Sequence, residues 1–94
     1  MAQEIGVIYV GNKPAPNYVL AAVTQFSMGS KKVALKARGR AISRAVDTAE
    51  LLKRFMGDKI EVEKITIGSE KVGEPGKERV VSTIEIIIAK KEEA

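Results

Sequence analysis

The residues best suited to chemistry in this chain are cations, which are concentrated in the segment KARGRAISRAVDTAE at residues 36–50. Four basic side chains occur within nine positions there, and acidic residues follow them: Lys36, Arg38, Arg40 and Arg44. Side chains of this kind attract anions, and several of them on one face indicate a polyanionic partner. The alternative interpretation is a solvated basic face whose charges pair with acids elsewhere in the chain.

The net charge of +4 conceals how local the positive charge is. Residues 1–30 hold one acidic and one basic side chain, and residues 45–94 hold eleven acidic and nine basic ones. Residues 31–44 hold six basic side chains and no acid. All of the excess therefore comes from fourteen residues, which favours one charged surface over a generally basic protein.

The chain lacks two of the commonest catalytic residue types, because it contains neither cysteine nor histidine. Thiolate nucleophiles, cysteine-type zinc sites and the commonest general base are therefore excluded. A small hydrolase or nuclease that uses Asp47, Glu50 or Glu85 with a divalent ion is kept as an alternative. Carboxylates three residues apart on a helix more often pair with basic neighbours, so we expect no enzyme, no metal site, no cofactor and no small-molecule substrate.

Length and composition predict one domain over residues 1–94, since the chain is close to the commonest domain size. The hydrophobic content of 45% and charged content of 30% are typical of a soluble protein. No apolar run approaches the roughly 20 residues that span a bilayer, and no basic region precedes the first apolar run as in a signal peptide. We therefore expect an intracellular protein without a membrane partner.

The first two elements that must position the cations are a strand and a helix. IGVIYV, residues 5–10, is a nearly continuous apolar run rich in β-branched residues, which is typical of a central strand covered on both faces. Apolar residues then recur at helical spacing after two prolines, which predicts a helix over 15–28. The aromatic residues follow these apolar patterns, so we interpret them as packing residues and not as base-stacking platforms: Tyr9, Tyr18, Phe26 and Phe55.

The second strand and helix carry most of the basic residues. Residues 31–38 alternate between apolar and polar, which predicts a half-buried strand, and apolar residues return at helical spacing from Arg40 to Gly57. Lys13 stands at the corresponding turn after the first strand, and free amides at both helix starts favour anions. Both turns open at the same end of the sheet, so we expect one basic surface: Lys13, Lys36, Arg38, Arg40 and Arg44.

The last third of the chain reads as a hairpin of two long strands, within residues 58–69 and 78–91. The apolar phase of the first strand changes between Val62 and Ile65, which predicts a bulge or a change of covered face. Residues 68–79 are longer than a hairpin turn and predict a projecting arm with a flexible tip. The order β-α-β-α-β-β predicts an α/β (α+β) two-layer sandwich, in which a four-stranded mixed sheet carries two helices on one face.

Two motifs, VGNKPAPNYVLA and KARGRAISRAVDTAE, resemble the Alba family of small basic chromatin and RNA-associated proteins of archaea, and VSTIEI extends the similarity. The resemblance implies homodimers that bind double-stranded DNA with little sequence preference, organise chromatin, and in many cases bind RNA. It implies phosphate contacts from the five cations of the expected surface, and minor-groove contacts from the paired arms around residues 68–79. The arm candidates are Lys71, Lys77 and Arg79.

The sequence departs from the family pattern in two places. Family members often carry two lysines in the first strand-to-helix turn, the first of which is acetylated, whereas Asn12 stands at that position here. The arm also has three acids against its three cations, which implies a weaker or more shape-dependent contact. Phe55 matches a position of contact between neighbouring dimers, with core packing as the alternative.

Double-stranded DNA is thus the expected partner, bound by a homodimer or a higher assembly on the chromosome in the cytoplasm. Structured RNA bound by the same surface is the alternative, because phosphate contacts need not discriminate strongly between the two polymers.

Overall fold

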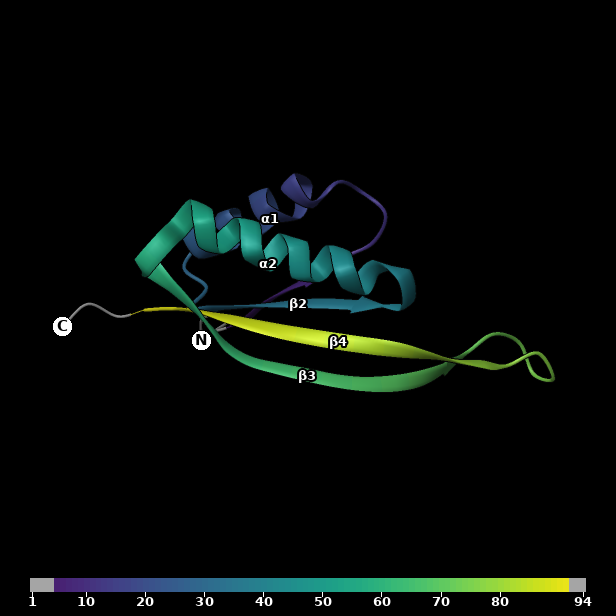
Figure 1. Ribbon diagram of the computed structural model, residues 1–94. Helices are drawn as coiled ribbons and strands as arrows, with labels where there is room; N and C mark the ends of the chain where they lie inside the picture. The colour runs from purple at the N-terminus through teal and green to yellow at the C-terminus, as the bar shows by residue number, and fades with distance from the viewer. Residues whose placement is uncertain (1–4, 92–94) are drawn as a thin grey trace.

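The computed structural model describes residues 5–91, so the domain expected over 1–94 extends at both ends beyond the described residues. Within that range the elements follow the predicted order (Figure 1). They are β1 (Ile5–Tyr9), α1 (Ala15–Ser27), β2 (Lys32–Arg38), α2 (Ile42–Met56), β3 (Ile60–Val72) and β4 (Arg79–Lys90). Short 3-10 turns, Gly39–Ala41 and Gly57–Lys59, flank α2. Neither described helix is long and apolar enough to span a bilayer.

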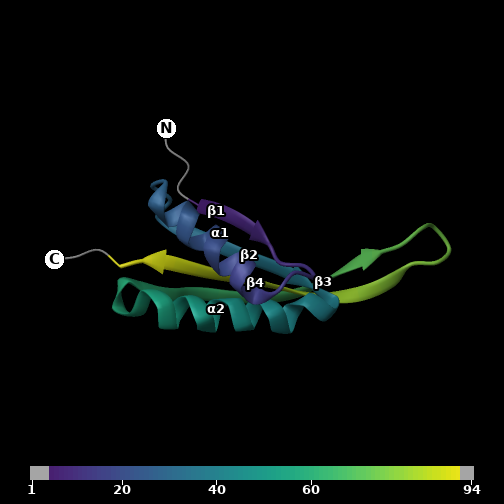
Figure 2. The ribbon, with the colours of Figure 1, turned by 90° about the horizontal axis from the view of Figure 1, so that it is seen from above.

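The four strands form one mixed sheet in the order β1-β2-β4-β3. β1 and β2 run parallel, and β4 lies antiparallel to both β2 and β3. Both helices pack on the same face, here called the helix-covered face, and leave the other as the open face (Figures 1 and 2). This arrangement confirms the predicted two-layer fold.

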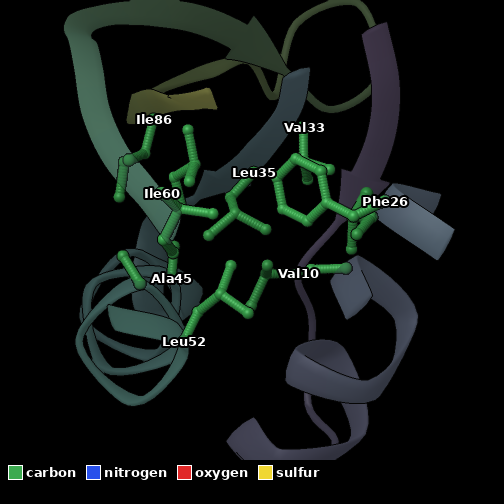
Figure 3. Packing of buried hydrophobic residues seen from close by; sticks show 12 residues of the cluster. Val10, Phe26, Val33, Leu35, Ala45, Leu52, Ile60 and Ile86 are labelled. Carbon is green, nitrogen blue, oxygen red and sulfur yellow. The ribbon is translucent and has the colours of Figure 1, made fainter. Parts of the chain in front are cut away.

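The core lies between the sheet and the two helices. Val33 and Leu35 alternate onto the helix-covered face of β2, and Leu52 reaches them from α2; all three are fully buried (Figure 3). Phe26 of α1 closes the side of this cluster, while Ala45 lets α2 lie close to the strands. Each large apolar side chain buried in this way stabilises the fold by roughly 1.5–3 kcal/mol relative to an exposed one. The packed core therefore holds both strand-to-helix turns at fixed places.

The prediction that the first strand is central is wrong, because β1 is an edge strand and β2 and β4 are the central strands. Ile8 is buried beneath α1, whereas Val7 and Tyr9 are 42% and 75% exposed on the open face. No helix covers that face, so the continuous apolar run does not translate into burial on both sides. The packing role predicted for Tyr9 is wrong for the same reason.

The hairpin extends far beyond the body of the sheet. A register shift between Val62 and Lys64 confirms the predicted bulge. Beyond it the strands remain paired through Gly68 with Thr83 as far as Val72 with Arg79, so the connection covers only residues 73–78 instead of 68–79. Sequence periodicity is weak there because both faces of the arm are exposed to solvent and need no apolar stripe. The resulting molecule is 54 Å long.

Candidate nucleic-acid interface

The ends of three strands meet at one end of the sheet. β1 and β2 are parallel, with Tyr9 opposite Lys36, so the turns that follow them leave from the same end. β4 runs antiparallel to β2, with Arg38 opposite Thr83, so β4 enters the sheet at this end and the arm projects from it (Figure 1). The topology therefore brings basic residues from three separate segments towards one place.

The turn after β1 is fixed by side chains from both helices. The Tyr18 hydroxyl of α1 accepts hydrogen bonds from the backbone N–H groups of Gly11 and Lys13, with N···O distances of 2.9 and 3.0 Å. From α2, Arg44 Nη1 donates to the Gly11 carbonyl at 3.3 Å. These bonds hold the backbone of Lys13 while its side chain stays exposed, as does that of Asn12.

The sequence did not reveal the positioning role of Tyr18, which fits the apolar stripe of α1 and is partly buried there. The available signal was its place in the first turn of the helix, directly after the basic turn. From that place a phenol can reach back to the loop amides that the turn leaves without partners.

The turn after β2 depends on Gly39, whose φ of +59° is the left-handed conformation that glycine adopts without strain. Arg40 lies exposed in the 3-10 turn that follows, and α2 begins only at Ile42. The predicted helical segment from Arg40 to Gly57 is therefore wrong at its start, because Arg40 belongs to the 3-10 turn and not to α2. No described side chain caps the N-terminus of α2, and its first N–H, that of Ile42, donates to the Gly39 carbonyl, so it is the positive end of the helix dipole that favours an anion here.

A small hollow of about 250 Å³ joins the body to the arm. Arg38 and Arg40 line it from the body and Arg79 lines it from the start of β4. The sequence placed Arg79 with the arm only, because the strand pairing that brings it back to the body is not visible without the register. We call Lys13, Arg38, Arg40, Arg44 and Arg79 the cationic corner.

Two of the predicted cations are already paired with carboxylates. Lys36 Nζ lies 3.4 Å from Glu85 on the neighbouring strand, and Arg38 Nη1 lies 2.8 Å from Glu70 of the arm. Both pairs are substantially exposed, and pairs of this kind contribute about 0–1 kcal/mol to stability, so a phosphate can compete for the cation. Lys36 lies on the open face, further into the sheet than the corner.

The other four members of the corner form no ion pair with any residue of the 5–91 range. They are Lys13, Arg40, Arg44 and Arg79. Of these four, Lys13, Arg40 and Arg79 are exposed, whereas Arg44 is partly buried and donates to the Gly11 carbonyl, so the charge of the first three is the most available to an external anion.

The remaining arm cations are not grouped together. Lys71 pairs with Val80 in the strand register and Val72 pairs with Arg79, so Lys71 and Arg79 point to opposite faces of the hairpin. Lys77 lies in the connection at the tip. The arm thus presents Arg79 to the corner and leaves Lys71 and Lys77 further out.

Phe55 lies at the far end of α2 from the corner and is 71% exposed. Its exposure rules out the core-packing alternative.

The carboxylates considered for a metal-dependent enzyme do not converge. Glu50 lies on α2 with Lys53 3.9 Å away, and Asp47 is exposed on the same helix. Glu85 points to the open face on the other side of the sheet, where it pairs with Lys36. Across residues 5–91 the structure groups no three acidic side chains suited to hold a metal ion.

Comparison with known proteins identifies the family of this chain. The Alba family model matches residues 6–69. The chain is 58% identical to the DNA/RNA-binding protein Alba of Methanocella arvoryzae, over 90% of each chain, and 54% identical to DNA/RNA-binding protein Alba 1 of Archaeoglobus fulgidus, over 89% of this chain and 94% of that one.

Two solved structures share the fold. Alba from Thermoplasma volcanium has a TM-score of 0.83 at 42% identity and covers 90% of this chain and all of its own. ALBA1 from Trypanosoma brucei has a TM-score of 0.78 at 27% identity and covers 98% of this chain and 74% of its own. The family model covers more than half of the sequence and the relatives match almost all of it, so this chain belongs to the Alba family.

Proposed function

We propose that this protein binds double-stranded DNA through its phosphates, with little sequence preference and without catalysis. The observation that carries this proposal is the cationic corner, in which separate segments place five cations near the start of α2, four of them without an ion pair to any described residue. Arginine and lysine contacts to phosphate supply affinity and orientation but carry little information about the bases. Such binding suits a protein that coats and organises the chromosome in the cytoplasm.

Duplex DNA fits the shape of this end better than duplex RNA does. The arm is a narrow two-stranded ribbon that leaves the body beside the corner (Figure 1). When the corner lies on the backbone of B-form DNA, the arm can follow the adjacent minor groove, whereas the minor groove of A-form RNA is wide and shallow. Duplex RNA bound through the same phosphate contacts is the second candidate, because the two relatives above are named DNA/RNA-binding proteins.

We further propose that the binding unit is a homodimer. Ile65, Ile67 and Val80 are 58%, 78% and 65% exposed at the helix-covered side of the hairpin. β3 is also an edge strand, whose unpaired backbone and apolar side chains make it a natural interface. A second copy would cover this patch and supply a second corner and arm, and Phe55 would remain exposed for contacts between neighbouring dimers on DNA.

The proposed dimer can be tested by measuring molecular mass in solution. Ile67→Glu places a charge within the apolar patch, and we expect it to convert a dimer to a monomer. Thr24→Glu, on an exposed position of α1, is the control that should leave the mass unchanged. A wild-type monomer, or a dimer that survives Ile67→Glu, contradicts this interface.

The function itself is tested by salt-titrated binding to matched DNA and RNA duplexes. If a dimer neutralises about 6–10 phosphates, affinity should fall by roughly 10³–10⁵ between 50 and 200 mM salt. Arg40→Ala should weaken binding to every duplex sequence and lower the salt slope by about 0.9 for each lost contact.

Lys31→Ala is the charge-matched control, because Lys31 is an exposed cation before β2, at the opposite end of the sheet. Equal losses in Arg40→Ala and Lys31→Ala would show that net charge, and not the corner, drives binding. Tighter binding to the RNA duplex at every salt concentration would make RNA the partner.

A further inference from the structure

A second hollow, of about 720 Å³, lies at the corner end of the sheet, next to the smaller hollow lined by Arg38, Arg40 and Arg79. Four of its residues form one register row across the sheet: Tyr9 pairs with Lys36, Lys36 with Glu85, and Glu85 with Thr66. Adjacent strands point paired residues to the same face, so all four side chains rise from the open face. The volume lies within the range of about 300–1,000 Å³ that is usual for ligand sites.

The hollow is open towards the next register row of the sheet, in which two of the three residues are small. In that row Arg38 pairs with Thr83, and Thr83 with Gly68. A Cβ atom at position 68 would lie 3.2 Å from the Thr83 hydroxyl, closer than most side chains tolerate. Gly68 therefore leaves space beside Thr66, at one end of the Tyr9–Thr66 row.

Tyr9 is the residue of this hollow that most strongly indicates a ligand. Its side chain is 75% exposed, and an aromatic ring left in water on a flat sheet face forgoes the stabilisation that burial would bring. Nucleobases are planar, and stacking a base on an aromatic ring strengthens binding whatever the base is.

The polar groups around Tyr9 favour a base over a bare phosphate. Lys36 and Glu85 form an ion pair beside the ring, and Arg38 and Glu70 form another at the rim. The cations and carboxylates balance, so the hollow offers no net attraction for an anion. Base edges carry both donors and acceptors; the Glu85 carboxylate can accept hydrogen bonds from them, and the Thr66 and Thr83 hydroxyls can donate or accept.

We propose that this hollow binds an unpaired nucleotide of a single-stranded segment, with its base stacked on Tyr9. Arg38 lines both hollows, so the phosphates that flank the base would continue onto the cationic corner. The inference rests on the proposed nucleic-acid function of that corner. A fully paired duplex cannot use the site, because its base faces are covered by their neighbours in the stack.

The test uses oligonucleotides that carry the fluorescent base 2-aminopurine, whose emission is quenched on stacking. Single-stranded DNA and RNA versions, and a fully paired duplex, are titrated with wild-type protein, Tyr9→Leu and Tyr9→Phe. With wild type we expect quenching in at least one single strand and none beyond the starting level in the duplex. Tyr9→Leu should abolish that quenching and weaken single-strand binding by roughly 5- to 150-fold, while Tyr9→Phe keeps both.

The duplex separates failure of this inference from failure of the proposed function. If wild type binds the duplex but Tyr9→Leu binds single strands as tightly as wild type, the stacking site is refuted and the duplex function stands. Equal losses on single strands and duplex in Tyr9→Leu would also refute it, because they would indicate a general defect. If wild type binds no duplex, the proposed function fails. If the 2-aminopurine emission is quenched in only the DNA strand or only the RNA strand, that strand identifies the kind of nucleotide that the site binds.

Discussion

The cationic corner and the outer arm both carry basic residues, five in the corner and two in the outer arm, but present them differently. In the corner, the first turn is fixed by hydrogen bonds that its amides donate to the Tyr18 hydroxyl and by one that Arg44 donates to its backbone, and only Arg38 has a carboxylate partner among the described residues. The outer arm, residues 70–78, spreads Lys71 and Lys77 over one face and the tip, and adds acids at Glu70, Glu74 and Glu78.

The difference shows that a binding surface depends on how its cations are grouped and paired as well as on how many there are. Electrostatic attraction depends on the local sum of charges within a Debye length, about 8–10 Å at physiological salt. On this basis the corner supplies most of the phosphate affinity, and the outer arm contributes shape and contact area.

The largest expected effect comes from removing two corner cations. Arg38→Ala with Arg40→Ala should weaken duplex DNA binding by roughly a hundredfold at moderate salt, because each charge-assisted contact contributes about 1.5–3 kcal/mol. Lys71→Ala with Lys77→Ala removes the same charge from the outer arm and should weaken binding by less than about tenfold. Fluorescence anisotropy with one labelled duplex measures both variants, and a larger loss from the arm pair would reverse the comparison.

A smaller effect is expected from loosening the corner without changing its charge. Tyr18→Phe removes the hydroxyl that accepts hydrogen bonds from the Gly11 N–H, which is partly buried, and from the Lys13 N–H, which is exposed. The unmet N–H groups should lower the free energy of unfolding by about 1–3 kcal/mol, and duplex affinity should fall a few-fold. Chemical denaturation measures the first quantity.

The matched control for that variant is Tyr9→Phe, which removes the hydroxyl of an exposed tyrosine. It should change the free energy of unfolding by less than about 0.5 kcal/mol. Equal stability of the two variants would mean that Tyr18 does not hold the turn.

The smallest expected effect is an increase in affinity for duplex DNA. Glu70→Gln with Glu74→Gln removes repulsion from the arm and frees Arg38 from its carboxylate, so duplex affinity should rise about two- to fivefold at low salt and less at high salt. Glu61→Gln, an exposed acid at the other end of β3, is the control and should leave affinity nearly unchanged. An unchanged affinity in the double variant would show that acids of the arm do not limit its contact with DNA.

Local rules were enough to predict the framework of the fold. The helix over 15–28 ends within one residue of α1, and the phase change after Val62 marks the observed bulge. These features depend on residues close in sequence, namely apolar spacing, prolines at a helix start and glycines at its end. They therefore needed no knowledge of the tertiary structure.

The errors that concern the sheet have a common cause, which is strand order and register. A run such as IGVIYV is equally compatible with a central or an edge strand, so the exposure of Tyr9 could not be seen. The pairing of Arg38 with Glu70 and the return of Arg79 to the corner join residues 30 or more positions apart. Only the pairing of β4 with both β2 and β3 brings them together.

The most direct test of the central claim is an amide chemical-shift map of the ¹⁵N-labelled protein with a short DNA duplex. We predict the largest shift changes at residues 11–13 and 38–44 and at Arg79, smaller changes in the outer arm, and almost none around Lys31 and Lys59 at the other end. Changes centred on the exposed surface of the helices, or spread evenly over both ends of the sheet, would contradict a binding surface built at the cationic corner.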